Sequence, residues 1–238
     1  MSNHHQHHQQ KHHEHCHVAS EKGVPGGVEY LSAMSYHCLY KASFERLKKA
    51  YENNSEAVNA LQDVQMALRD AEHHSPSILF DLAKILLDDS QLNIDLQQSF
   101  LRMQASAPND DLELSYLAKF PEFSEFSKRA IALRQVLARI PDNIADRRVF
   151  LEMIKEIASS IKRLLDTTNH IIEMLPGPCQ QLIEKRKREF VHTSKLFSVT
   201  LKDFFKSQNC SQVYAVANRL IFQTLQIFRA LREKVRLQ

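Results

Sequence analysis

The sequence predicts an all-α protein, and three observations lead to that fold class. Long stretches place apolar residues three or four positions apart, whereas runs that alternate apolar and polar residues are almost absent. The 238 residues include only 4 Gly and 7 Pro, so few positions interrupt a helix. Hydrophobic residues make up 43% of the chain, which is enough for the core of one large or two modest domains.

Charge is distributed unevenly along the chain. Residues 1–120 carry 10 Lys and Arg against 16 Asp and Glu, and residues 121–238 carry 21 against 12. The first half therefore has a net charge of −6 and the second half of +9. A basic second half favours acidic partners, which include peptides, anionic lipid and nucleic acid.

The cysteines and the hydropathy indicate a reduced, cytoplasmic protein. Cys16, Cys38, Cys179 and Cys210 are far apart and form no C-x-x-C pair, which argues against a disulfide framework or a zinc knuckle. The chain contains no apolar run of 18 residues, and its N-terminus lacks the pattern of a signal peptide.

Residues 1–33 form a tail rich in histidine and glutamine, which we expect to be disordered. Residues 13–17 match the H-E-x-x-H signature of zinc proteases, in which two histidines lie one turn apart on a rigid helix. No apolar residues flank His13 and His17 to dock such a helix, and so histidine-rich a tract produces matches by chance. We therefore assign no catalytic residue, metal ligand or cofactor, although weak metal binding by the tail stays open.

Three amphipathic helices are expected between residues 34 and 89. Ser75 as N-cap and Pro76 at the first helical position begin the third of them. Leu86 and Leu87 widen its apolar surface beyond what three short helices can cover. This predicts a helical dimerisation domain over residues 34–89. The alternative, in which the excess surface packs on the second half of the same chain, stays open.

Residues 90–120 are expected to form a helical connector. Asn93 is the predicted N-cap of a helix that contains Phe100 and Leu101, and Pro108 with two acidic neighbours ends this part of the chain.

Four helices over residues 121–238 predict a four-helix bundle. The first ends near Pro141, the second spans residues 150–175, the third spans residues 179–206, and the last follows a break at residues 207–210. Pro176, Gly177 and Pro178 make the connection between the second and third helices so short that these must be antiparallel neighbours.

On the second and third helices of this bundle, a strip that holds a small residue and two lysines lies beside the core face. We call this strip the basic shoulder of the helix. At about 100° per residue, a small residue and two lysines follow the core line in the same rotational sense on both helices. Shoulders of this kind open onto one face of an antiparallel pair. They predict a shallow groove, with small residues on its floor and lysines on its rims, although two ordinary bundle helices with solvated lysines remain an alternative. The groove residues are Lys155, Ala158, Lys162, Lys195, Ser198 and Lys202.

Several ordered segments of the sequence are distinctive. They include FLRM at residues 100–103, RIPD at 139–142, IKEIASSIKRLLDTTN at 154–169, KREFV at 187–191 and ANRLI at 217–221. With these segments the chain resembles the programmed cell death protein 10 family, also called the cerebral cavernous malformation three family. The resemblance covers residues 39–229 and is strongest from residue 121 onward.

This resemblance implies a non-enzymatic adaptor. The first helices would form a homodimer, or a heterodimer with germinal-centre group III Ste20-like kinases. The bundle would be a focal-adhesion-targeting homology domain that binds striatin and leucine-aspartate motif helices, such as those of paxillin and malcavernin. The protein would be cytoplasmic, with peripheral association with the Golgi or the plasma membrane. The family's groove lysines fall on the four lysines chosen above by angle, and its dimer-interface positions correspond to Val64, Ala67, Leu86 and Leu87.

Two other classes of function have less support. An enzyme is disfavoured because the sequence has no Gly-rich phosphate loop, no G-x-S-x-G and no paired carboxylates outside the tail. The alternative function is binding of anionic lipid or nucleic acid by the basic bundle surface, with KRKR at residues 185–188 as its main support. No aromatic residues interleave there to stack on bases, so we expect no nucleic-acid binding, while a phosphoinositide contact stays open.

Overall fold

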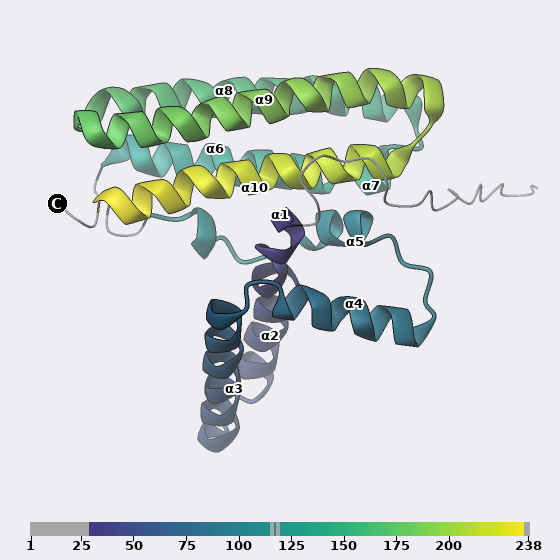
Figure 1. Ribbon diagram of the computed structural model, residues 1–238, viewed down its shortest axis with the longest axis vertical. Helices are drawn as coiled ribbons and strands as arrows, with labels where there is room; N and C mark the ends of the chain where they lie inside the picture. Colours follow the sequence, from purple (N-terminus) through teal and green to yellow (C-terminus); the bar gives the residue numbers. More distant parts are fainter. Residues whose placement is uncertain (1–28, 115–116, 118–119, 236–238) are drawn as a thin grey trace, which may run out of the picture.

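The computed structural model describes residues 29–114, 117 and 120–235, and over these residues its regular structure is helical without any strand (Figure 1). This confirms the predicted all-α class. The H-E-x-x-H match at residues 13–17 lies outside the described residues. No helix in the described part of the chain is long and apolar enough to cross a membrane.

Five helical elements form the N-terminal part of the structure. They are α1 (Glu29–Ser32), the π-helix η1 (Tyr36–Lys41), α2 (Ala42–Ala50), α3 (Ser55–His74) and α4 (Ile78–Ser90). Because η1 continues directly into α2, these elements correspond to the three helices predicted between residues 34 and 89. Figure 1 shows α2 and α3 side by side, with α4 projecting away from them.

Two of the predicted N-caps are wrong. Ser75 is the extended C-cap residue of α3, where its N–H donates to the carbonyl of Ala71 at 2.8 Å, and α4 begins only after a turn at residues 75–77. The N-cap of α5 (Leu96–Met103) is Asp95 rather than Asn93, because the Asp95 carboxylate accepts the N–H of Gln98 at 3.0 Å. At α5 the cap position is taken by the residue whose side chain reaches a free N–H group of the first turn, whereas Ser77, the N-cap residue of α4, makes no side-chain capping hydrogen bond.

Residues 96–114 pack against the bundle. Here α5 and the short 3₁₀ helix η2 (Asp110–Leu112) contact both α6 (Pro121–Ala138) and α10 (Cys210–Val235). Phe100, Leu101 and Leu112 are buried in the same core as the bundle helices. The segment expected to be a connector therefore supplies part of this core.

Four long helices close a ring, which confirms the predicted four-helix bundle. They are α6, α8 (Arg147–Met174), α9 (Gly177–Ser207) and α10, with the single turn α7 (Ile140–Asn143) between α6 and α8. Each helix packs on the next along the chain and α10 returns to α6 (Figure 1). Phe126 stacks on Phe228 with ring centroids 4.6 Å apart, and Phe150 meets Phe204 edge to face at 5.5 Å. These aromatic pairs tie α6 to α10 and α8 to α9.

The N-terminal helices share this core. Leu31 of α1 is fully buried in it, and Gln97 of α5 accepts hydrogen bonds from the Tyr30 hydroxyl at 3.1 Å and from the Asn218 side chain of α10 at 2.8 Å. The best-covered residues of α4 are Leu79 and Phe80, and Phe80 packs on Phe100 with ring centroids 6.2 Å apart. Farther along α4, Leu87 is half-buried, whereas Leu82, Ile85 and Leu86 are exposed.

Candidate partner-binding surfaces

The six predicted groove residues are all exposed on α8 and α9. Two contacts align these helices: the Phe150–Phe204 ring contact near one end, and the hydrogen bond from Lys187 Nζ to Asn169 Oδ1, at 3.0 Å, near the other. Between these two contacts, the groove residues of α8 lie opposite those of α9 in reverse order along the chain. At two positions a groove lysine of α8 lies approximately level with a groove lysine of α9, and between these positions Ala158 lies approximately level with Ser198.

The same hydrogen bond indicates which way the two shoulders face. Asn169 lies about 100° from the core line of α8, and Lys187 lies about 60° from that of α9, in the same sense as the groove residues. Because these two side chains meet, both shoulders open onto one side of the helix pair. The structure thus brings the groove residues to a common outer face.

Most of the positive charge on this face is available to a partner. Lys155 forms an ion pair with Glu152 of the same helix at 2.8 Å. Over the described residues, the other three groove lysines have no ion pair. An exposed pair of the Lys155–Glu152 type is worth less than about 1 kcal/mol, so it does not prevent Lys155 from turning to a partner.

The predicted dimer-interface residues lie on α3 and α4. Val64 and Leu86 are 50% and 60% exposed, Ala67 is exposed, and Leu87 is half-buried. A group of exposed leucine and valine side chains indicates a surface that another protein can bind, because binding would remove these apolar side chains from water.

An apolar stripe on α4 extends beyond the predicted interface. Ile78, Leu82, Ile85 and Leu86 are all exposed and follow the i, i+4, i+7, i+8 spacing of one helix face. Leu87 lies about 100° from Leu86, toward the covered side of the helix. The sequence shows α4 to be apolar on more than one side, but only the structure identifies which side is left open.

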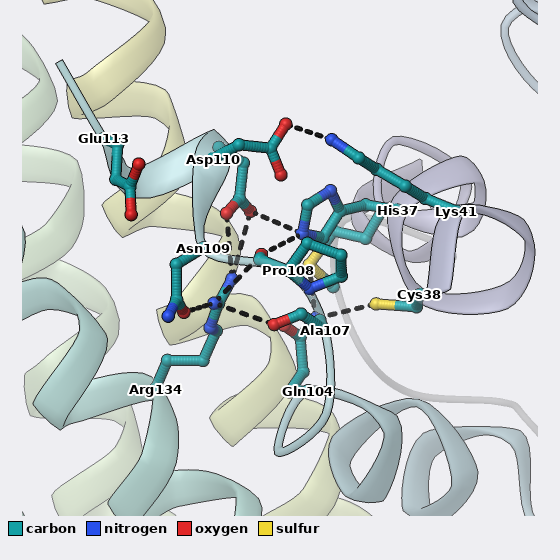
Figure 2. Close-up of polar contacts among 12 residues, drawn as sticks. His37, Cys38, Lys41, Gln104, Ala107, Pro108, Asn109, Asp110, Glu113 and Arg134 are labelled. Carbon is teal, nitrogen blue, oxygen red and sulfur yellow. Dashed lines mark hydrogen bonds and ion pairs between the residues drawn. The ribbon is translucent and has the colours of Figure 1, made fainter. Parts of the chain in front are cut away.

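A polar cluster joins the N-terminal helices to the bundle, as Figure 2 shows. Its centre is the acidic turn, which we define as residues 107–113. On the bundle side Arg134 of α6 is only 2% exposed and donates to both carboxylate oxygens of Asp111, at 2.9 and 3.2 Å, and to the carbonyls of Ala107 and Pro108. Arg232 of α10 donates to the backbone carbonyls of the same turn.

The N-terminal side of the cluster belongs to η1. His37 Nε2 lies 2.7 Å from the carbonyl oxygen of Pro108 and 3.4 Å from Asp111 Oδ2, and Lys41 forms an ion pair with Asp110 (Figure 2). The acidic turn is thus held by cationic and N–H groups from both parts of the molecule. The sequence does not indicate this cluster, because its members come from distant elements and follow no periodic pattern.

The pKa values in the cluster reflect burial and charge. Burial lowers the pKa of His37, an effect that Asp111, the Pro108 carbonyl and Asp110 oppose and that Arg134 reinforces. Burial alone would raise the pKa of Asp110, but the hydrogen bond and charge of Lys41, together with His37, lower it overall. At neutral pH an ionised Asp110 carboxylate therefore lies beside a neutral His37 imidazole.

By distance alone this cluster resembles a metal site, since ligand atoms of His37, Asp110 and Asp111 lie within 4.8 Å of one another. The charged groups around it argue against a metal ion. Lys41 already pairs with Asp110, and Arg134 with Asp111. In the 2.7 Å contact with a carbonyl oxygen, His37 Nε2 must carry a hydrogen, so Nε2 is not free to bind a metal and only Nδ1 keeps a lone pair. The cluster is a balanced polar contact.

Burial at this junction predicts an inert cysteine. Burial raises the pKa of the Cys38 thiol to about 12, whereas Cys210 is only half-buried. The thiolate fraction of Cys38 is then on the order of a thousandfold below that of an ordinary thiol, whose pKa is about 8.5. In the folded protein at pH 8 we expect Cys38 to react with iodoacetamide at least about tenfold more slowly than Cys210, by mass spectrometry of the labelled peptides. Equal labelling rates that persist without denaturant would contradict this prediction.

The basic run at residues 185–188 is partly neutralised by its own helix. Arg186 pairs with Glu189 at 2.9 Å, and Lys187 pairs with Glu184 at 2.6 Å. Both basic side chains are partly buried, which leaves Lys185 and Arg188 as the exposed charges of the run. A surface of two such charges is a weak basis for binding lipid or nucleic acid.

Two family models match the chain. The model described as programmed cell death protein 10, dimerisation domain, matches residues 28–93, and the model described as programmed cell death protein 10, C-terminal, matches residues 94–189. The chain belongs to the programmed cell death protein 10 family. It is also 48% identical to the programmed cell death protein 10 homolog of Caenorhabditis elegans over 207 residues, which make up 87% of this chain and 96% of that relative.

Membership of the programmed cell death protein 10 family confirms the resemblance inferred from the sequence motifs. The dimerisation domain of this family covers α1 to α4, and the C-terminal model begins directly before α5. A dimerisation domain supports a homodimer, and together with the family it indicates a helical adaptor.

Proposed function

We propose that this chain is a non-enzymatic adaptor that dimerises through α3 and α4 and binds acidic, amphipathic helices of the leucine-aspartate type on the α8/α9 face. The observation that carries the second part is the common outer face of α8 and α9, on which small residues are flanked by four lysines. The first part is supported by the open apolar stripe of α4 within a dimerisation domain.

Shape and charge together favour an acidic helix on the α8/α9 face. A helix with an apolar stripe can approach two helices closely where the residues between them are small, as at Ala158 and Ser198. Acidic residues beside that stripe would then meet the groove lysines on either side. Such exposed pairs set orientation and association rate more than affinity, so the apolar contact must supply most of the binding free energy.

The family resemblance suggests which partners carry these features. We propose group III Ste20-like kinases as heterodimer partners of α3 and α4, leucine-aspartate motif proteins of the paxillin and malcavernin type on the α8/α9 face, and striatin on the bundle. Through them the protein would reach the Golgi or the plasma membrane from the cytoplasm. The alternative, direct binding to anionic lipid or nucleic acid, has less support because the run at residues 185–188 is half neutralised.

Titration of a fluorescent leucine-aspartate peptide by polarisation tests the adaptor function. We expect saturable binding that weakens as salt rises from about 50 to 500 mM, because screening reduces the attraction between exposed charges. A peptide whose leucines are replaced by alanine is the matched control and should not bind. The absence of saturable binding by the leucine peptide at low salt would refute the proposal for this face.

A further inference from the structure

The turn that joins α2 to α3 has a feature that the proposed function does not use. It consists of Tyr51, Glu52, Asn53 and Asn54, all of which are exposed. We propose that Tyr51 is a phosphorylation site, and that the phosphorylated turn binds an SH2 domain of the class that reads an asparagine two residues after phosphotyrosine. This inference is independent of the partners proposed for α3, α4 and the α8/α9 face.

Tyr51 is the tyrosine that a kinase can reach most easily. It is 51% exposed, and over the described residues its hydroxyl has no hydrogen-bond partner. The other described tyrosines are buried or half-buried; they are Tyr30, Tyr36, Tyr40 and Tyr214. Modification of Tyr51 therefore disturbs no packed side chain.

The residues after Tyr51 match the ligand of one class of SH2 domain. Of the six tyrosines in the chain, Tyr51 alone is followed by asparagine at the second position, which is Asn53. A side-chain amide offers a donor and an acceptor, so it can form two hydrogen bonds with the backbone of a partner. SH2 domains hold the phosphate with arginine, and this class adds such a pair of hydrogen bonds to the asparagine. The Asn53 side chain is exposed and has no hydrogen-bond partner in the described part of the chain.

The backbone of the turn already has the conformation that this class of SH2 domain binds, a β-turn rather than an extended strand. The Asn54 N–H donates to the Tyr51 carbonyl at 2.8 Å, which closes a four-residue turn with tyrosine first and asparagine third. Among the described residues other than glycine, only Gln91 and Gln208 have positive φ, so both central residues of the turn have negative φ. A hydrogen-bonded turn of that kind, without a cis peptide bond, is of type I. Binding thus requires little further ordering of the chain.

The position of the turn leaves room for a bound domain. Figure 1 shows α2 and α3 side by side and projecting from the bundle, and the turn joins them at the end far from it. Both helices run back from the turn, so neither extends toward a domain bound there. Val64 of the predicted dimer interface follows Asn54 by ten residues, which correspond to about 15 Å along α3. The proposed SH2 site is therefore separate from the predicted dimer interface.

Phosphorylation supplies the group that the SH2 domain recognises. In a tyrosine kinase the Tyr51 phenol oxygen attacks the γ-phosphate of ATP, the bond from that phosphate to ADP breaks, and the phenolic proton passes to a base of the kinase. The product has a charge of about −1.5 to −2 at pH 7 and three acceptor oxygens for the SH2 arginines. Tyrosine kinases bind their substrate as an extended segment, and an exposed turn between two helix ends opens at little cost.

The first experiment measures binding by the full chain with phosphotyrosine incorporated at position 51 by genetic code expansion. Isothermal titration calorimetry with an isolated SH2 domain of the asparagine-reading class should give one site per chain, with a Kd of about 1 µM or lower. Treatment with a tyrosine phosphatase should abolish this binding. Asn53→Ala in the phosphorylated chain should weaken it about thirtyfold or more, because two hydrogen bonds are lost.

Two controls test whether the asparagine and the turn are read. Asn54→Asp changes the neighbouring residue but keeps an oxygen that can accept the Ala57 N–H as the N-cap of α3, and it should bind within a few-fold of the phosphorylated wild type. An SH2 domain that binds extended ligands and reads an apolar residue at the third position after phosphotyrosine meets the polar Asn54 there. It should bind at least about tenfold more weakly.

The second experiment tests modification of the folded chain. A tyrosine kinase that phosphorylates the free peptide of residues 47–58 is incubated with ATP and the full chain, and mass spectrometry should locate phosphate at Tyr51 in the wild type but not in Tyr51→Phe. Phosphorylation of the peptide without phosphorylation of the folded chain would overturn the proposal. So would failure of the folded, phosphorylated chain to bind the asparagine-reading SH2 domain, or equal binding by Asn53→Ala, with circular dichroism confirming the fold.

Discussion

Reversing the charge of all four groove lysines is expected to reduce binding of an acidic leucine-aspartate helix below detection. Each exposed pair contributes only about 0.2 to 1 kcal/mol, so one Lys→Ala change should weaken binding a few-fold at most. Replacing the four lysines by glutamate turns four attractions into repulsions, and the sum of several kcal/mol corresponds to a loss of at least about a hundredfold. The measurement is the peptide titration described above, with circular dichroism to confirm the fold.

Two further variants separate charge from shape and position. Ala158→Trp fills the floor between the helices while all four lysines remain, and it should also block docking. Lys185→Glu with Arg188→Glu changes two exposed charges of α9 outside the groove, and this control should bind within a few-fold of the wild type. The assignment of the groove fails if the folded quadruple variant and Ala158→Trp both bind as the wild type does.

Replacing Leu86 and Leu87 together by aspartate is expected to abolish self-association. If α4 packs against a second copy of the chain, each aspartate would place an unpaired charge in an apolar interface, which costs several kcal/mol per subunit. The chain should then elute as a monomer in size-exclusion chromatography with light scattering, and the bundle should keep its helical signal. Binding of a group III kinase tail should be lost with the homodimer if both use the same surface.

Leu86 and Leu87 differ in exposure, and this difference determines which variants serve as controls. Leu86 lies on the open stripe, whereas Leu87 is half-buried, so Leu86→Asp alone is the variant with less risk to folding. Leu92→Asp is the matched control, because Leu92 is 61% exposed but lies beyond the end of α4. A double variant that stays dimeric at micromolar concentration would show that α4 is not the interface.

Much of the fold could be predicted from local pattern. The long bundle helices have an apolar residue every three or four positions, and such a pattern can bury its apolar face only as a helix. The break at residues 176–178 was sufficient to predict that α8 and α9 are antiparallel neighbours, and from that the common face of the groove residues followed. The caps were less predictable, because Ser75 and Asp95 are decided by which backbone groups are still free at the helix end.

Sequence alone therefore determined the helical class, the four-helix bundle and the family, because each depends on periodicity or on a contiguous motif. The groove residues on the α8/α9 face stay a prediction from the same periodicity. Only the tertiary structure decided which side of α4 stays open, and that residues 96–114 join the bundle core, since burial depends on what else packs nearby. It alone also brought His37 to Asp111 and Arg134. Contacts between single polar side chains of distant elements leave no periodic trace in a sequence, because one hydrogen bond constrains only the two residues that form it.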